Sequence, residues 1–106
     1  MKKKEEKILV AIKEPGREPY VEHIDNTLEE MQEIVGGYIE TFGFAQDACI
    51  VCNEEGKLMG LPYNVRLLGQ DFVVPVFVCG VDGDRFTSIR AAHVPLVLRM
   101  LKGDKT

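Results

Sequence analysis

The sequence predicts a single α+β domain spanning residues 1–106. We expect a mainly antiparallel sheet of about five strands, covered by helices on one face. Short apolar segments separated by turn-forming residues recur along most of the chain, whereas helical spacing of apolar residues occurs in only two places. With 106 residues, of which 45% are hydrophobic, the chain can bury one core but not two. The lysine-rich start, residues 1–6, is expected to be disordered.

The first element expected is a β-hairpin. Residues 8–12 are a short apolar run bounded by charged residues, and residues 20–24 partly alternate between apolar and polar. Between them, residues 14–19 contain two prolines and a glycine, which is the composition of a turn.

A helix follows the hairpin. Thr27 stands three residues before Glu30, the spacing of a capping box, although Asp25 and Asn26 are alternative caps. Apolar residues then recur at helical spacing. The glycine pair 36–37 ends the helix, because glycine takes the left-handed conformation at a helix end without penalty.

Three further strands are predicted. Residues 38–45 alternate, residues 48–52 are almost continuously apolar, and Gln46-Asp47 between them forms a tight turn. Residues 71–81 are the most hydrophobic segment and are rich in β-branched side chains, which favours one strand. Pro75 lacks a backbone donor, so this strand is at an edge there or is bulged.

Residues 87–102 are predicted to form a C-terminal helix, or two short ones. Apolar side chains between Ile89 and Leu101 keep helical spacing. Pro95 interrupts the helical hydrogen bonds unless it opens a second helix, so we expect a kink or boundary at Val94.

Residues 53–67 are irregular and are predicted to be a loop. They combine polar groups, glycines and apolar residues directly after the apolar strand 48–52. Loops of this kind are where binding groups are usually found, so this segment is the first place to look for a site.

Composition restricts the possible partners and compartment. Thirteen Lys and Arg against seventeen Asp and Glu give a net charge of −4, which disfavours binding to duplex nucleic acid. No apolar run approaches the roughly 20 residues needed to cross a bilayer, so no membrane association is expected. The expected location is the cytoplasm.

The cysteines are expected to be buried free thiols. An odd number, three, agrees with a reducing compartment. Cys49 and Cys52 have the spacing of a redox or zinc pair, but residues three apart on a strand point to opposite faces of the sheet. Cys79 lies in an apolar run and is interpreted in the same way.

Two long segments resemble a known family. Residues 24–40 (IDNTLEEMQEIVGGYIE) and 53–67 (NEEGKLMGLPYNVRL) together resemble small proteins of unknown function found in bacteriophages and in Firmicutes that carry mobile elements. The resemblance does not include the segment from Thr87 onward. It implies no established reaction or cofactor. The genomic setting implies action on host machinery by binding, for example by capturing nucleotide signals of bacterial defence systems.

A nucleotide-type ligand requires donors for phosphate oxygens, flat surfaces for a base, and amides for base edges or ribose hydroxyls. The loop and the end of the preceding helix offer all three. The candidate binding residues are Tyr38, Asn53, Lys57, Tyr63, Asn64 and Arg66. Turn chemistry explains the same residue types without a ligand, with Asn64 as a turn residue and Arg66 as a surface ion-pair partner. A real site would require Tyr38 and the loop to converge.

Catalysis is not expected. The two histidines, His23 and His93, have no metal-ligand spacing, and neither lies in the loop. We therefore expect no catalytic residue, no metal and no cofactor.

The leading hypothesis is a non-enzymatic protein that sequesters a small nucleotide-derived immune signal as a phage counter-defence. The alternative is a protein-interaction module that docks a host protein through its acidic surface or its C-terminal helix. The apolar side chains of that helix equally suit a homodimer or higher homo-oligomer. These side chains are Leu96, Val97, Met100 and Leu101.

Overall fold

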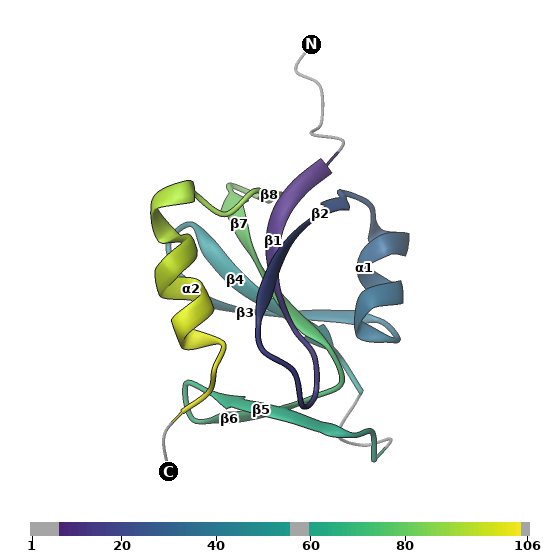
Figure 1. Ribbon diagram of the computed structural model, residues 1–106. Helices are drawn as coiled ribbons and strands as arrows, with labels where there is room; N and C mark the ends of the chain where they lie inside the picture. The colour runs from purple at the N-terminus through teal and green to yellow at the C-terminus, as the bar shows by residue number, and fades with distance from the viewer. Residues whose placement is uncertain (1–6, 56–59, 105–106) are drawn as a thin grey trace.

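The computed structural model describes residues 7–55 and 60–104. Its fold is a sheet that is covered on both faces (Figure 1). The described residues form eight strands, two α-helices and one short 3-10 helix. The strands are β1 (Lys7–Lys13), β2 (Tyr20–Asp25), β3 (Ile39–Ala45), β4 (Ala48–Asn53), β5 (Tyr63–Leu67), β6 (Gln70–Val73), β7 (Val76–Asp82) and β8 (Arg85–Thr87). The helices are α1 (Leu28–Val35), η1 (Ala91–His93) and α2 (Val94–Met100).

The strands form two antiparallel sheets. The larger has the order β2-β1-β7-β4-β3, with β8 paired to the end of β7, and the smaller is the hairpin β5-β6. The predicted α+β class and antiparallel pairing are confirmed. The expected number of about five strands is too low, because the predicted loop contains β5, residues 71–81 divide between β6 and β7, and β8 follows as a further strand.

The helices cover opposite faces of the larger sheet, so the expectation of helices on one face is wrong (Figure 1). Met31 and Val35 of α1 pack on one face, and α2 packs with the β5-β6 hairpin on the other through residues such as Val97. The reason lies in the central strands. Residues 76–80 of β7 are all buried, so both faces of the strand require cover.

The first hairpin and α1 form as predicted. β1 and β2 pair from Lys7 with Asp25 to Ile12 with Tyr20. Thr27 is the N-cap of α1, and its hydroxyl accepts a hydrogen bond from the Glu30 amide at 3.2 Å. The helix ends at Gly36, whose φ of 81° is the left-handed conformation that favours glycine.

Residues 71–81 are not one strand. β6 ends at Val73 and β7 begins at Val76, and the two strands belong to different sheets. The chain turns at Val74, whose φ is 49°, and continues through Pro75. Proline cannot donate to a ladder, so the strand breaks at the position where an edge or bulge was expected.

Residues 53–67 are not an irregular loop throughout. Residues 63–67 form β5, which pairs with β6 through a two-residue turn. Leu68 and Gly69 in this turn have φ of 52° and 77°, the signs of a type I′ turn. A register shift between Tyr63 and Val65 interrupts the alternation, which explains why the sequence pattern did not indicate a strand.

The segment from Thr87 onward is also not a single helix. Thr87 is the last residue of β8, and the helical part is limited to η1 and α2. The boundary expected at Val94 is confirmed, since η1 ends at His93 and Pro95 lies in the first turn of α2. Gly80 allows the chain directly after β8 to approach β7, because a Cβ there would meet the carbonyl oxygen of Ser88.

The three cysteines are buried thiols, as predicted, and none of them forms a disulfide among the described residues. Cys49 and Cys79 are cross-strand neighbours on the face covered by α1, and their sulfur atoms are 3.9 Å apart. Cys52 lies on the opposite face. Within the described residues, no helix is long and apolar enough to cross a bilayer.

Candidate functional site

Asn53, at the end of β4, anchors the end of α1. Its Nδ2 donates to the Val35 carbonyl oxygen at 3.0 Å, and its Oδ1 accepts from the Glu55 amide at 2.8 Å. Gly37 lies against this side chain, because a Cβ there would be 2.9 Å from Asn53 Nδ2. The Asn53 amide is therefore occupied by the fold itself.

Tyr38 and Asn53 do meet at one hollow. A surface depression of about 300 Å³ lies beside the end of α1 and is lined by Gln32, Gly36, Gly37, Tyr38, Asn53 and Glu55. The Tyr38 side chain is 68% exposed, so an aromatic face is available beside the hollow. This depression brings together two of the sequence-predicted residues.

Asn64, in β5, has a structural position. Its Nδ2 donates to the carbonyl oxygens of Lys13 and Val74, both at 2.7 Å, and its Oδ1 accepts from Lys13 Nζ at 3.2 Å. Asn64 is buried. Its amide fastens the β5-β6 hairpin to the end of β1.

Lys13 is a buried group that the sequence analysis did not select. Its Nζ also donates to the Glu14 carbonyl oxygen at 2.7 Å. Desolvation by burial lowers the pKa of Lys13, while the carboxylates of Glu18 and Glu14 oppose that shift. A lysine directly following an apolar strand was the available signal, but a charge at a strand end is usually solvated.

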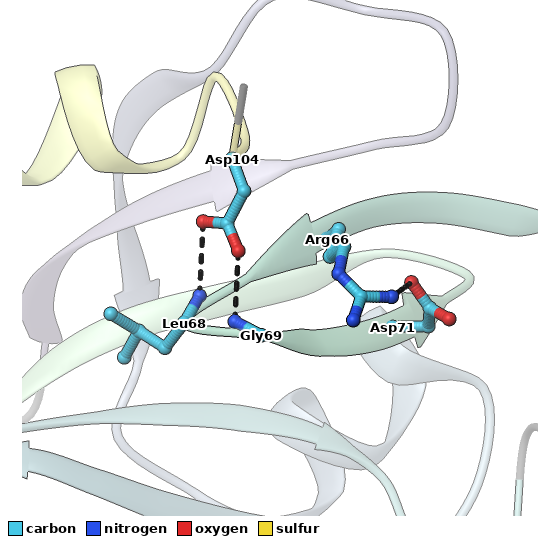
Figure 2. A network of polar contacts seen from close by, with 5 residues as sticks. All are labelled: Arg66, Leu68, Gly69, Asp71 and Asp104. Atoms are coloured by element: carbon cyan, nitrogen blue, oxygen red, sulfur yellow. Dashed lines mark hydrogen bonds and ion pairs between the residues drawn. The ribbon is translucent and has the colours of Figure 1, made fainter. Parts of the chain in front are cut away.

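Arg66 is an ion-pair partner on the surface, as the alternative interpretation held. Figure 2 shows its guanidinium beside Asp71, with Nη1 and Oδ1 3.0 Å apart. Close by, the carboxylate of Asp104 accepts from the amides of Leu68 and Gly69 at 3.1 and 2.8 Å (Figure 2). The second contact ties the segment after α2 to the β5-β6 turn.

The candidate residues therefore fall into two groups. Tyr38 and Asn53 lie at the end of α1, whereas Tyr63, Asn64 and Arg66 lie on β5 and do not line the depression beside Tyr38. Tyr63 is 59% exposed. The remaining candidate, Lys57, lies outside the described residues.

An acidic hollow separates β3 from β6. It holds about 120 Å³, and its lining includes Glu40, Phe42, Asn53, Glu54, Asp71 and Phe72. The rings of Phe42 and Phe72 meet edge to face, with centroids 5.6 Å apart, and form the apolar floor. Three carboxylates around a small hollow favour a cationic group over a phosphate.

An apolar groove lies between α2 and the β3-β4 hairpin. It holds about 250 Å³, and its lining includes Phe44, Ile89, His93, Leu96, Val97 and Met100. Arg90 and Asp47 close one part of its rim with an ion pair, Nε to Oδ2 at 3.3 Å. The groove offers few polar groups and is suited to an apolar side chain.

A third hollow lies on the opposite face of the sheet. It holds about 380 Å³, and its lining includes Thr41, Gly43, Ala45, Cys49, Val81 and Phe86. The small side chains of β3 create this space, since a Cβ on Gly43 would meet nothing within 4 Å. These three hollows and the depression beside Tyr38 each border β3 or the residue before it.

The fold and this surface define a small α+β domain with hollows clustered along one sheet edge. The chain belongs to the family of the domain of unknown function DUF3846, whose model matches residues 7–102. The family match includes α2, which the resemblance found in the sequence did not. No curated protein and no solved structure matches the chain.

Proposed function

We propose that this protein is a non-enzymatic protein-interaction module that docks a partner through the groove between α2 and β3. The observation that carries the proposal is the exposure of Leu96, 63%, on the rim of a groove lined mainly by apolar side chains. Exposed apolar surface beside an apolar groove is the usual mark of a docking site.

Charge supports a protein partner over a polyanion. The chain carries a net charge of −4, and carboxylates line the hollow next to the groove. A partner with basic residues gains favourable electrostatic energy at this surface, whereas phosphate groups are repelled.

We propose a non-enzymatic role because the histidine and cysteine side chains, which could act in catalysis, do not lie together. His23 lies on β2 and His93 before α2, and the three thiols are buried. Among the residues that the structure describes, no group of three His, Cys, Asp or Glu side chains is placed to hold a metal ion.

A pull-down from host lysate with matched variants tests the docking surface. Leu96→Asp places a charge on the groove rim, and Leu28→Asp places the same charge on α1, where Leu28 is 54% exposed. We expect a stoichiometric protein that is retained by Leu28→Asp and lost by Leu96→Asp. A partner retained equally by both variants would refute docking at this groove.

A small nucleotide-type ligand is the second candidate. The exposed ring of Tyr38 beside the depression lined by Gln32 and Asn53 favours it, because a base can stack on such a ring. Calorimetry with cyclic and linear nucleotides tests it, with Tyr38→Ala as the variant and Tyr63→Ala as the control. Binding lost only in Tyr38→Ala, with the ligand recovered intact after denaturation, would establish sequestration. Binding to no nucleotide would exclude it.

The proposal also includes the cellular location and the genetic origin of the protein. We place the protein in a bacterial cytoplasm, encoded by a phage or mobile element and acting on a host component. A second copy of the chain is the other occupant considered for the groove. Light scattering tests it: a dimer mass reduced to a monomer mass by Leu96→Asp would assign the groove to a homodimer.

A further inference from the structure

β3 is an edge strand with backbone groups that point away from the sheet. Within the described residues it pairs on one side only, with β4. The Glu54 amide donates to the Tyr38 carbonyl oxygen at 2.8 Å, in register with the β3-β4 ladder. Because antiparallel pairs alternate, Glu40 and Phe42 bond to β4, and the amides and carbonyls of 39, 41 and 43 face outward.

This edge has little of the protection that edge strands usually carry. Its sequence, IETFGFA, holds one charged residue and no lysine or proline. The other edge, β2, reads YVEHID and carries two carboxylates. A register shift after Gly43 bends β3 only at its end, so the outward groups at 39, 41 and 43 precede it.

Two of the hollows border side chains on the same face of β3. Alternate residues of β3 share a face, so Glu40, Phe42 and Phe44 lie on the side of α2 and β6. Glu40 lines the acidic hollow and Phe44 lines the apolar groove. Glu40 and Phe44 are four positions apart, which is about 13 Å along a regular strand.

We propose that β3 binds an extended peptide segment of a partner protein as an added β-strand. An apolar side chain of the segment fills the groove beside α2, and a Lys or Arg four positions away enters the acidic hollow. Of the three residues between them, the first and third face the hollow beside Thr41 and Gly43. This mode of recognition uses main-chain hydrogen bonds for affinity and alternate side chains for specificity. It rests on the proposed docking function and specifies its partner.

Charge complementarity selects this occupant over a second copy. The acidic hollow contains Glu40, Glu54 and Asp71, and only Asp71 has an ion-pair partner among the residues that the structure describes. β3 itself contains no Lys or Arg. A second β3 strand paired to this edge therefore leaves the carboxylates without a cation.

Amide hydrogen exchange measured by NMR tests strand addition directly. The probes are synthetic heptapeptides with a leucine and a lysine four positions apart, in either order, with threonine and valine between them. On binding, the exchange rates of the amides of 39, 41 and 43 should fall to roughly one tenth or below, because each amide must first break a new hydrogen bond. The amides of Glu40 and Phe42, already bonded to β4, should change little.

A charge reversal tests whether Glu40 contacts the lysine of the peptide. Glu40→Lys should weaken binding of the lysine peptide by roughly tenfold and restore binding of a peptide with glutamate in place of lysine. Glu22→Lys, on the opposite edge of the sheet, is the matched control and should leave both affinities unchanged. Leu96→Asp should weaken both peptides.

Each outcome separates the two proposals. Peptides that bind without protecting the amides of 39, 41 and 43 would overturn strand addition and leave docking at the groove intact. Binding of no peptide at millimolar concentration would overturn the inference, while the lysate experiment decides the docking function independently. Protection of the same amides in a peptide-free dimer would assign the edge to a second copy instead.

Discussion

Asn53 and Asn64 show how buried amides organise this molecule at the scale of single residues. Asn53 joins the end of α1 to the end of β4, and Asn64 joins β5 to β1 and to the residue between β6 and β7. Each side chain uses both its donor and its acceptor. No buried side-chain nitrogen or oxygen in the described residues lacks a partner. Removal of either amide therefore leaves backbone groups unpaired.

Asn53 and Gly37 should be energetically coupled. Asn53→Ala should lower the free energy of unfolding by about 1–3 kcal/mol, because it leaves buried backbone groups without partners. Gly37→Ala should also destabilise, since its Cβ would lie 2.9 Å from Asn53 Nδ2. In the Asn53→Ala background the added Cβ should cost about 1 kcal/mol less. Urea denaturation of the double-mutant cycle measures this difference.

Gly43→Ala provides the control for that cycle. A Cβ at Gly43 meets nothing within 4 Å, so this substitution should leave stability nearly unchanged. Equal destabilisation by Gly37→Ala in both backgrounds would contradict the contact with Asn53.

Asn64→Ala should be more damaging than Asn53→Ala. It removes the hydrogen bonds to two carbonyl oxygens and the acceptor for buried Lys13, so we expect a loss of about 2–4 kcal/mol. Thermal denaturation measures it. Tyr63→Ala, at the neighbouring exposed position of β5, should change stability little. Similar effects of the two substitutions would show that Asn64 does not hold the hairpin.

At the scale of elements, the β5-β6 hairpin is the part that the sequence pattern concealed. It packs through Val65, Leu67 and Phe72 on the same face as α2, and Asp104 caps its turn. Its type I′ turn places a leucine, Leu68, at a φ of 52°, a conformation that side chains other than Asn, Asp and Gly adopt with strain.

Leu68→Asn should therefore stabilise the protein. Asparagine tolerates the left-handed conformation, and Leu68 is 57% exposed, so little buried apolar surface is lost. We expect a gain of about 0.5–1 kcal/mol in the free energy of unfolding, measured by urea denaturation. Leu96→Asn, at an exposed position with helical geometry, is the control and should give no gain. A loss of stability in Leu68→Asn would argue against the turn.

At the scale of the whole molecule, the sheet is covered on both faces, and the three thiols are buried. Cys49 and Cys79 are on the face that α1 covers, where Cys49 borders the hollow beside Thr41 and Gly43, and Cys52 is on the face of α2 and the β5-β6 hairpin. The hydrogen bond with Cys49 and desolvation by burial raise the pKa of Cys79 well above its usual range.

Native protein should consequently resist alkylation. Iodoacetamide at pH 8 should label none of the three cysteines in the folded state and all three in urea, as counted by mass spectrometry. The same hydrogen bond to Cys79 lowers the pKa of Cys49, while burial opposes that shift. Because the folded pKa of Cys79 is raised, its own contribution to stability is fully present below the unfolded value of 9.0 and is lost as pH rises above it. Cys79→Ala should reduce that alkaline loss. Rapid labelling of the native protein would show that one face is open.

Local patterns were sufficient for several elements and for bringing two of the six candidate residues, Tyr38 and Asn53, to one depression. The Thr27 cap, the glycine at the end of α1 and the turn between β3 and β4 depend on neighbouring residues, so the sequence predicted them. The meeting of Tyr38 with Asn53 followed from their places at the ends of adjoining elements. By contrast, the position of Asn64 against Lys13 joins residues 51 apart in sequence, and no local pattern encodes that contact.

The sequence by itself determined the fold class, the capped helix α1, the buried thiols, the acidic charge and the family. These depend on composition, on spacing and on motifs that act over a few residues. Only the tertiary structure decided which faces the helices cover, that residues 71–81 divide between two sheets, and that β3 is an edge bordered by hollows. Those features arise from strand order and long-range packing. The sequence pattern of a charge-poor strand such as β3 is the same whether the strand lies at the centre or at the edge of a sheet, so the pattern does not reveal its position.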